Sequence, residues 1–228
     1  MLLYLRQFSD NPPALFAYIA AMVVAYVTGI AFHEFCHAWA AYQLGDDTAA
    51  RMGRLTLNPI KHLDPLGSIL LVLVGFGWGK PTPVNPYRLR NGVKRGNMLV
   101  AAAGPASNFF FAALAALPFK LGWITTIASF DQIGSASRGE IFGLFLLFVV
   151  YINVLLGVFN LIPINPLDGF KVVAGMLPGQ MSREFNKLAA WGPGILMALF
   201  AISFILPQYN VLGWIIGGMG DRVLNIIT

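Results

Sequence analysis

The composition of this 228-residue chain is that of a membrane protein. Hydrophobic residues make up 57% of it, charged residues only 11%, and the mean hydropathy is +0.68. This balance excludes an ordinary soluble globular domain. The net charge of +5 would suit nucleic acid or an anionic membrane face. The cations gather between apolar runs, which favours the membrane. The single cysteine, Cys36, excludes an internal disulfide.

Five apolar runs approach or exceed the roughly 20 helical residues that cross a bilayer core of about 30 Å. They are residues 13–44, 97–121, 141–163, 188–206 and 209–227. We read the first run as a retained membrane helix, because only Arg6 precedes it as a positive charge and it extends to Tyr42. The predicted fold is therefore an all-α polytopic membrane protein, with residues 1–228 in one membrane-embedded domain.

A sixth apolar run, residues 66–79, is too short for a full crossing. Its 14 residues would span about 21 Å as a helix. We expect a re-entrant or interfacial element here. In the next stretch, residues 79–89, three prolines fix extended backbone. This stretch either forms an irregular β-hairpin-like loop with an open edge or is merely punctuated by turns.

The charges orient the chain in the membrane. Of the 15 lysines and arginines, 8 lie between residues 51 and 96, and another 3 lie between residues 171 and 187. The 122–140 loop carries Arg138 against Asp131 and Glu140. By the positive-inside rule, residues 45–96 and 164–187 face the cytoplasm and residues 122–140 face outward.

The pattern His33-Glu34-Phe35-Cys36-His37 lies inside the first apolar run. On a helix His33 and His37 project from the same face, so both imidazoles can bind one Zn²⁺ with Glu34 beside the metal-bound water. The alternative is a pair of packing histidines. Ionisable groups are costly at membrane depth and mark functional sites, which favours the metal. Cys36 points away from the ligand face and is expected to be inert.

A catalytic zinc site usually takes three protein ligands. The third ligand should be His62, the only other histidine, or a carboxylate. Asp168 is the best carboxylate, because Pro163 and Pro166 break the preceding helix and Gly169 permits an unusual turn. The alternative for Asp168 is an ordinary Asp-Gly turn at a membrane exit.

Two motifs together resemble the site-2 protease family of intramembrane zinc metalloproteases. One is His-Glu-x-x-His at residues 33–37, and the other is Asn-x-x-Pro-x-x-x-Leu-Asp-Gly at residues 160–169. Residues 103–108 (AGPASN) are similar to the family's Gly-Pro-x-x-Asn segment. Residues 62–68 and 76–86 resemble the loop of a compact, mainly prokaryotic branch, and no PDZ-like or CBS-like insertion is visible. The resemblance covers residues 13–170.

The resemblance implies a three-helix catalytic core within residues 13–170, followed by a helical pair at 188–227. It implies one Zn²⁺ per chain, with His33, His37 and Asp168 as ligands. Glu34 would be the general base, and Asn160 would bind the substrate carbonyl or its oxyanion. Gly104 and Pro105 would serve packing and the helix kink, whereas Asn108 would serve either packing or chemistry.

The implied function is a zinc endopeptidase that cuts transmembrane segments in regulated intramembrane proteolysis. Its partners would be a transmembrane substrate helix and the lipid bilayer of the cell membrane, with no nucleic acid, and its active site would lie toward the cytoplasmic side. One alternative is a metal transporter or channel, although transporters tend to carry several intramembrane ionisable groups and internal repeats. Another is an inactive homologue that binds substrate as a scaffold.

Overall fold

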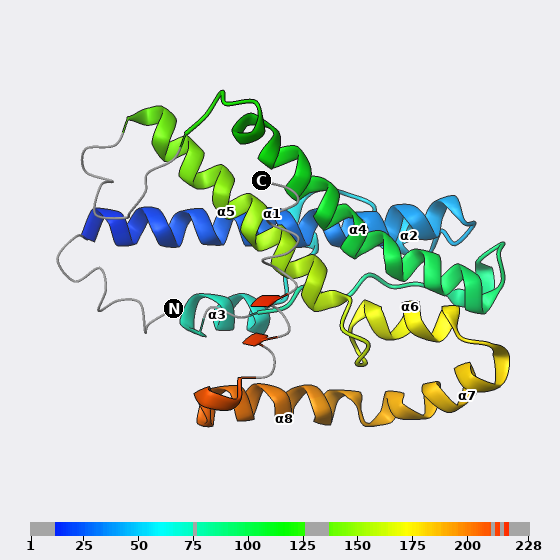
Figure 1. The fold of residues 1–228 in the computed structure, drawn as a ribbon. Helices are drawn as coiled ribbons and strands as arrows, with labels where there is room; N and C mark the ends of the chain where they lie inside the picture. Colours follow the sequence, from blue (N-terminus) through cyan, green and yellow to red (C-terminus); the bar gives the residue numbers. More distant parts are fainter. Residues whose placement is uncertain (1–11, 75–76, 126–136, 211–212, 215–216, 219–228) are drawn as a thin grey trace.

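Three long apolar helices form the body of the molecule (Figure 1). The computed structural model describes residues 12–74, 77–125, 137–210, 213–214 and 217–218. The three helices are α1 (Pro12–Gln43), α4 (Val93–Lys120) and α5 (Arg138–Asn160), and each contains a stretch long and apolar enough to cross a membrane. They correspond to the first three long runs expected from the sequence. The prediction of a helical, multi-pass membrane protein is therefore confirmed.

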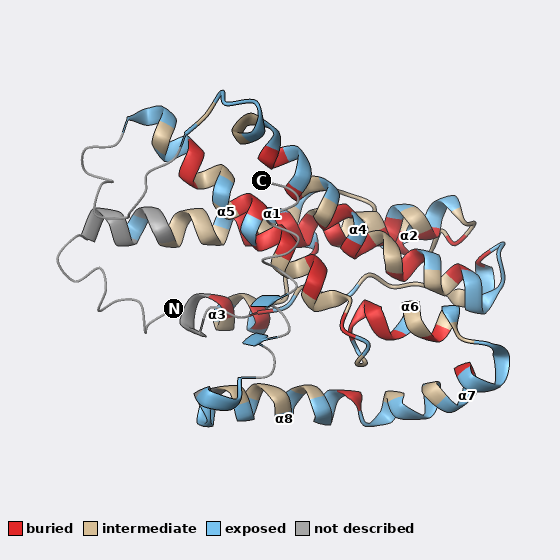
Figure 2. Ribbon diagram, viewed as in Figure 1, coloured by how far each residue is buried: buried red, intermediate tan, exposed pale blue. Residues whose placement is uncertain are grey.

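The three helices pack through small side chains. Ala25, Ala112 and Ala116 are fully buried between them. Gly157 lets α5 approach α4, because a Cβ there would lie 2.8 Å from the Phe109 ring. Such small-residue contacts are typical of helices that associate in lipid. In Figure 1, α1 and α5 run in the same direction and α4 runs in the opposite direction, while Figure 2 shows buried residues concentrated where the three meet.

The connection from α1 to α4 folds back on itself. It contains α2 (Thr48–Arg51), η2 (Pro59–Lys61), α3 (Pro65–Val74) and η3 (Pro86–Arg88). The 10-residue α3 is about 15 Å long. The chain returns beside its point of departure, because Leu63 and Gly79 form an antiparallel bridge and the Lys80 N–H donates to the His62 carbonyl over 2.7 Å. Whether this excursion enters a membrane stays a prediction.

The β-hairpin considered for residues 79–89 is not formed: the described residues contain no strand, only the Leu63–Gly79 bridge. Pro81, Pro83 and Pro86 remove three N–H donors that a ladder would need. Prolines also hold the residue before them in extended backbone. The segment is thus extended without being paired as a strand.

The C-terminal part is a chain of shorter helices. These are α6 (Asp168–Met176), α7 (Gly179–Lys187), η5 (Leu188–Ala190), α8 (Gly192–Ile205) and η6 (Pro207–Tyr209). The run expected as one helix at 188–206 is broken, since Gly179–Ala190 and Gly192–Ser203 form a pair bent by 59° that could count as a fourth, broken span. The break brings Gly192 against Asn165, where a Cβ would lie 2.2 Å from the Asn165 carbonyl oxygen. The last predicted run, 209–227, lies largely outside the described residues.

Candidate metal centre

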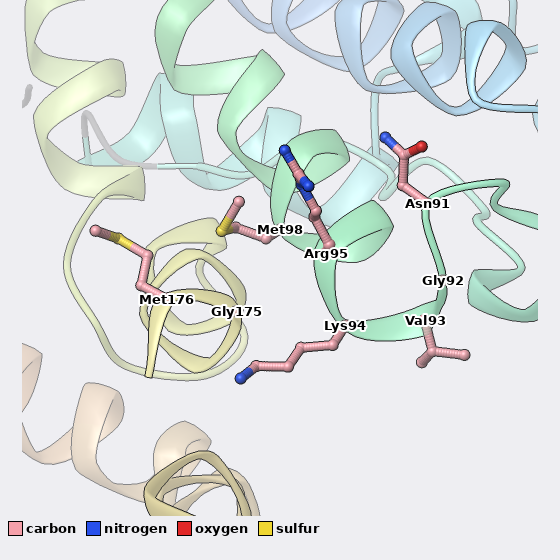
Figure 3. Close-up of a pocket in the computed structure, with 8 residues that line it drawn as sticks. All are labelled: Asn91, Gly92, Val93, Lys94, Arg95, Met98, Gly175 and Met176. Atoms are coloured by element: carbon pink, nitrogen blue, oxygen red, sulfur yellow. The ribbon is translucent and has the colours of Figure 1, made fainter. Parts of the chain in front are cut away.

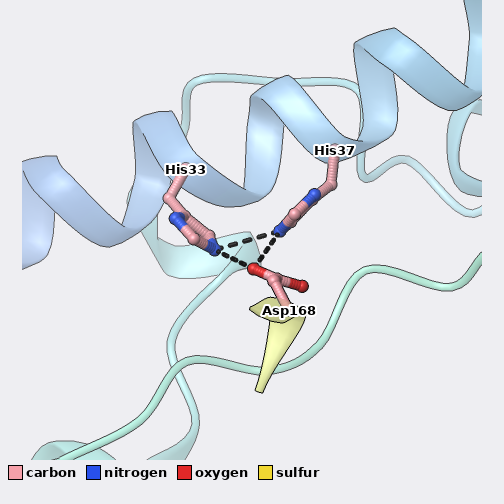
Figure 4. Close-up of side chains that lie close together, drawn as sticks. All are labelled: His33, His37 and Asp168. Carbon is pink, nitrogen blue, oxygen red and sulfur yellow. Dashed lines mark hydrogen bonds and ion pairs between the residues drawn. The ribbon is translucent and has the colours of Figure 1, made fainter. Parts of the chain in front are cut away.

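His33, His37 and Asp168 meet at one point between α1 and the start of α6 (Figure 4). Asp168 Oδ2 lies 3.1 Å from His33 Nε2 and 3.0 Å from His37 Nε2, and the two Nε2 atoms are 3.0 Å apart. All three residues are buried. Ligand atoms around a tetrahedral zinc at 2.0–2.1 Å are about 3.3 Å apart. The triangle is therefore close to the size that a small metal ion requires.

The local sequence explains how Asp168 reaches the two histidines. Helix α5 ends at Asn160, the chain turns through Pro163 and Pro166, and Asp168 becomes the first residue of α6. Gly169 makes the turn possible, because a Cβ there would lie 2.1 Å from the carbonyl oxygen of Leu161 at the end of α5. The helix breakers in the sequence thus fold the carboxylate back against α1.

Hydrogen bonds at Nδ1 of each imidazole leave the two Nε2 atoms as acceptors that face the centre of the cluster. His37 Nδ1 lies 2.7 Å from the Val100 carbonyl oxygen, and His33 Nδ1 lies 2.6 Å from Asn108 Oδ1. Both partners accept hydrogen bonds, so the neutral rings carry their proton on Nδ1. Two Nε2 lone pairs and a carboxylate then converge, an arrangement that needs a cation at its centre. The residues present therefore fit a metal ion.

The ionisation of Asp168 depends on positive charge beside it. Burial alone would raise the pKa of the Asp168 carboxyl. When His37 is protonated instead of bound to metal, its charge and the hydrogen bonds from the two imidazoles outweigh burial and hold this pKa below its usual range. A cation bound to the neutral rings would act on the carboxylate in the same direction. Asp168 is thus an ionised carboxylate, the form that ligates metals.

Gly104 of α4 makes room for the two imidazoles. A Cβ at this position would lie 2.4 Å from His37 Nε2 and 2.6 Å from His33 Cε1. Heavy atoms cannot approach so closely, so only glycine lets α4 pass the rings at this height. The sequence analysis predicted a packing role for Gly104. In the structure this residue makes room for the imidazoles of His33 and His37 against α4.

Glu34 is held by residues 79–89, which we call the proline-rich segment. Its Oε2 accepts the Thr82 N–H over 2.8 Å, and its own carbonyl accepts the Thr82 hydroxyl over 3.0 Å. Lys80, two residues earlier, is fixed in turn by the His62 carbonyl and by the Arg54 guanidinium on its carbonyl oxygen. The carboxylate of Glu34 is therefore oriented by backbone that is itself anchored.

One cavity of about 640 Å³ joins these groups. It lies between α1, α5, residues 77–84 and α8, and His33, Glu34, His37, Asn160 and Asp168 all line it. The remaining wall is mostly apolar, including Phe159 and, on α8, Leu196 and Phe200. An apolar chain could occupy this space with its backbone beside the histidines.

Two other candidate residues lie apart from the metal cluster. His62 is fully buried, with Nε2 2.7 Å from the Thr56 carbonyl oxygen, and it braces the loop instead of joining His33 and His37. Asn160 donates Nδ2 to the Leu156 carbonyl over 2.9 Å within its own helix, although it also lines the cavity. Cys36 is partly buried outside the cluster.

The sequence analysis missed Thr82 and Asn153 near this site. Asn153 is fully buried and accepts a hydrogen bond from Asn108 over 2.8 Å. Its signal was an isolated amide within the apolar run 141–163, where a polar side chain is expensive. No comparable signal marks Thr82, whose role depends on a contact across 48 positions of sequence.

A second, shallow cavity lies at the beginning of α4 (Figure 3). Its wall combines the cationic Lys94 and Arg95 with Met98 and Met176. It contains no His, Cys, Asp or Glu. The metal-ligating groups and this cavity are thus separate features.

Long apolar helices and a buried His-Glu-x-x-His pair joined by a carboxylate define a membrane protein of the metallopeptidase class. The chain is 34% identical over 225 residues to "Putative zinc metalloprotease YwhC" of Bacillus subtilis, covering 97% of this chain and 96% of that protein. It is 28% identical over 192 residues to "Putative zinc metalloprotease Rip2" of Mycolicibacterium smegmatis, covering 83% and 68%. For the protein of that name in Mycobacterium tuberculosis the identity is 27% over 209 residues, covering 90% and 74%.

The model of Peptidase family M50 matches residues 118–201. No solved structure matches the chain significantly. The chain belongs to Peptidase family M50, the site-2 protease family. The family expected from the two sequence motifs is thereby confirmed.

Proposed function

We propose that this protein is a zinc-dependent endopeptidase that cleaves transmembrane segments of other membrane proteins. The observation that carries the proposal is the buried His33–His37–Asp168 triangle in the wall of a largely apolar cavity between membrane-length helices. Cleavage of a transmembrane segment would require the metal, the base and water to meet within the membrane in a cavity lined by protein. The names of the relatives support zinc as the metal.

We assign one Zn²⁺ per chain to His33, His37 and Asp168. When bound, the metal supplies Lewis-acid activation of a water molecule and of the scissile carbonyl. Glu34 takes the proton from the attacking water and later delivers it to the leaving amine. Asn160 donates to the developing oxyanion through the amide hydrogen that its contact with Leu156 leaves over.

The proline-rich segment is suited to hold an unwound substrate strand. Between residues 80 and 86 only Lys80, Thr82, Val84 and Asn85 have a backbone N–H. Those of Lys80, Thr82 and Asn85 donate to His62, Glu34 and Asp46. The Val84 N–H has no partner among the described residues, and Val84 lines the cavity. Substrate backbone would pair here by β-augmentation.

Replacing Val84 tests that pairing. Val84→Pro removes the N–H, and Val84→Ala keeps it as the matched control. Cleavage should fall in Val84→Pro alone, with zinc content unchanged in both variants. Unchanged cleavage by Val84→Pro would contradict the strand-pairing hypothesis.

We infer that residues 1–228 form one membrane-embedded protease domain in the cell membrane, with a core at 13–170 and a C-terminal pair at 188–227. Contacts of α6 with α4, and packing of α8 on Phe159, Ile162 and Leu167, support one unit. The His37 end of α1 adjoins the cationic 45–96 connection, so the active site would lie toward the cytoplasm.

The decisive experiment is cleavage of a model transmembrane substrate in proteoliposomes. Wild-type protein should cut it, a chelator should stop cleavage, and added Zn²⁺ should restore it. Glu34→Gln should retain zinc while turnover falls at least 10²-fold, the scale of a lost general base. Full activity in Glu34→Gln would contradict the mechanism. Metal flux through the liposomes without cleavage would favour a transporter, and zinc binding with neither would favour a scaffold.

A further inference from the structure

A row of buried amides connects all three long helices behind His33. Asn108 of α4 accepts from His33 Nδ1 on α1, and its Nδ2 donates to Asn153 Oδ1 of α5 over 2.8 Å. Asn153 Nδ2 in turn donates to the Val149 carbonyl over 2.8 Å. Asn108 and Asn153 are both fully buried. The four groups form a continuous row of hydrogen bonds, which we call the amide relay (His33, Asn108, Asn153 and the Val149 carbonyl).

Backbone carbonyls fix the direction of every bond in the amide relay. The Val149 oxygen only accepts, so Asn153 must direct its NH₂ there and its oxygen toward Asn108. Asn108 then presents NH₂ to Asn153, and the same NH₂ donates to the Gly29 carbonyl over 3.2 Å. The Asn108 oxygen is left for His33, whose Nδ1 must carry the proton.

We propose that Asn153 is a positioning residue for the metal ligand His33. It touches neither the cluster nor the cavity, and acts by holding the orientation of Asn108 and through it the His33 tautomer with Nε2 free. Hydrogen-bond partners of a ligating histidine set its ring orientation and basicity, and their loss typically weakens metal binding by roughly 10–100-fold. The proposal rests on the assignment of His33 as a zinc ligand above.

The position of Asn153 argues against simple packing. It lies in the middle of α5 among the apolar Val150, Ile152 and Val154, all buried. An amide at membrane depth is costly unless it is hydrogen-bonded, and an apolar side chain would fill the site without that cost. Helix α1 also approaches it closely, since a Cβ on Gly29 would lie 3.1 Å from Asn153 Oδ1.

The proposal can be tested without an activity assay, by measuring the zinc affinity of the full-length protein in detergent. Competition with a chelator gives this affinity. Asn153→Ala should weaken zinc binding by about 10-fold or more. Asn153→Asp, which as a neutral carboxyl group would keep both an acceptor for Asn108 and a donor for the Val149 carbonyl, should bind zinc more tightly than Asn153→Ala. Val150→Ala is the control, because it opens a cavity in the same helix without touching the relay. It should lower the melting temperature and leave zinc affinity unchanged.

A double-mutant cycle separates the relay from general loosening. Once Asn108→Ala has removed the link, adding Asn153→Ala should weaken zinc binding no further. Should Asn153→Ala fail to fold, Gly29→Ala gives the same test by displacing Asn153, and it should also weaken zinc binding.

Unchanged zinc affinity in the folded variant, or full additivity in the cycle, would overturn the positioning role of Asn153 alone. Absence of zinc binding by the wild-type protein would instead overturn the proposed function, and this inference with it.

Discussion

Thr82 is attached to Glu34 twice, through its backbone N–H to Oε2 over 2.8 Å and through its hydroxyl to the Glu34 carbonyl over 3.0 Å. These bonds join the proline-rich segment to the proposed general base across 48 positions of sequence. The proline-rich segment, which lines the cavity, therefore also sets the direction of the carboxylate.

Loss of the Thr82 hydroxyl should slow turnover. Thr82→Ala removes one of the two bonds, and a net hydrogen bond is worth about 1 kcal/mol, so kcat should fall about fivefold. Thr82→Ser keeps the hydroxyl and should restore kcat. Zinc content should be unchanged in both, because Thr82 does not contact the ligands. Equal kcat in the Ala and Ser variants would argue against orientation of Glu34 by this hydroxyl.

A single methyl group at Gly104 should abolish metal binding. In Gly104→Ala the new Cβ would lie 2.4 Å from His37 Nε2, so the imidazole must move off the cluster. Gly194→Ala is the matched control, because nothing lies within 4 Å of a Cβ there. Metal analysis of the two purified variants gives the answer. Full zinc occupancy in Gly104→Ala would place the metal elsewhere.

The third ligand can be decided between Asp168 and His62. Asp168 lies in the triangle, whereas His62 bonds the Thr56 carbonyl. Asp168→Ala should lose zinc and activity together, and His62→Ala should keep zinc near the wild-type level. His62→Ala should lower the melting temperature, since a fully buried ring is removed. Zinc loss in His62→Ala with retention in Asp168→Ala would reverse the assignment.

Replacing Asn160 should show whether its side chain stabilises the oxyanion or only its own helix. If its amide stabilises the oxyanion, Asn160→Ala should lower kcat by about 10²-fold with zinc affinity unchanged. If its contact with the Leu156 carbonyl is all that matters, the melting temperature should fall and kcat should stay near wild type. Steady-state kinetics and thermal unfolding of the same preparation distinguish the two outcomes.

The sequence predicted the parts of the fold that depend on local composition. Apolar length is enough to locate α1, α4 and α5, and the four-residue spacing of His33 and His37 puts both on one face of a helix. It did not predict the bend at Trp191, because that depends on the close approach of Gly192 to Asn165. The hairpin considered for residues 79–89 is absent because three of its residues are prolines without an N–H and the N–H groups of Lys80, Thr82 and Asn85 bond other parts of the chain.

The candidate site likewise contains residues that local sequence predicts and residues whose roles depend on distant contacts. His33, His37 and Asp168 could be proposed as metal ligands from motifs and helix breakers. Thr82 and Gly104 lie against Glu34 and His37, which are 48 and 67 positions away in the sequence. Asn153 bonds Asn108, 45 positions away. Asn153 reaches His33 only through Asn108. Such pairings are set by how helices pack, which no short stretch of sequence encodes.

The final prediction concerns which side of the membrane each connection faces. Leu63 and Gly79 are paired, so the excursion through α3 leaves and returns at one level. Residues on both sides of it should then share one face, and the loop after α4 should lie on the other. A full crossing by residues 66–79 would instead place the cationic 80–96 stretch outside, against the positive-inside rule.

Exposed positions allow this to be tested with single cysteines in a Cys36→Ala background. Met52 is 64% exposed and Tyr87 87% exposed, on either side of the excursion, and Trp123 after α4 is 76% exposed. A membrane-impermeant thiol reagent should label Met52→Cys and Tyr87→Cys from the same side, the cytoplasmic one, and Trp123→Cys from the opposite side. Labelling of the first two from opposite faces would mean that α1 and α5 cross in opposite directions, and His37 and Asp168 could not then share a metal.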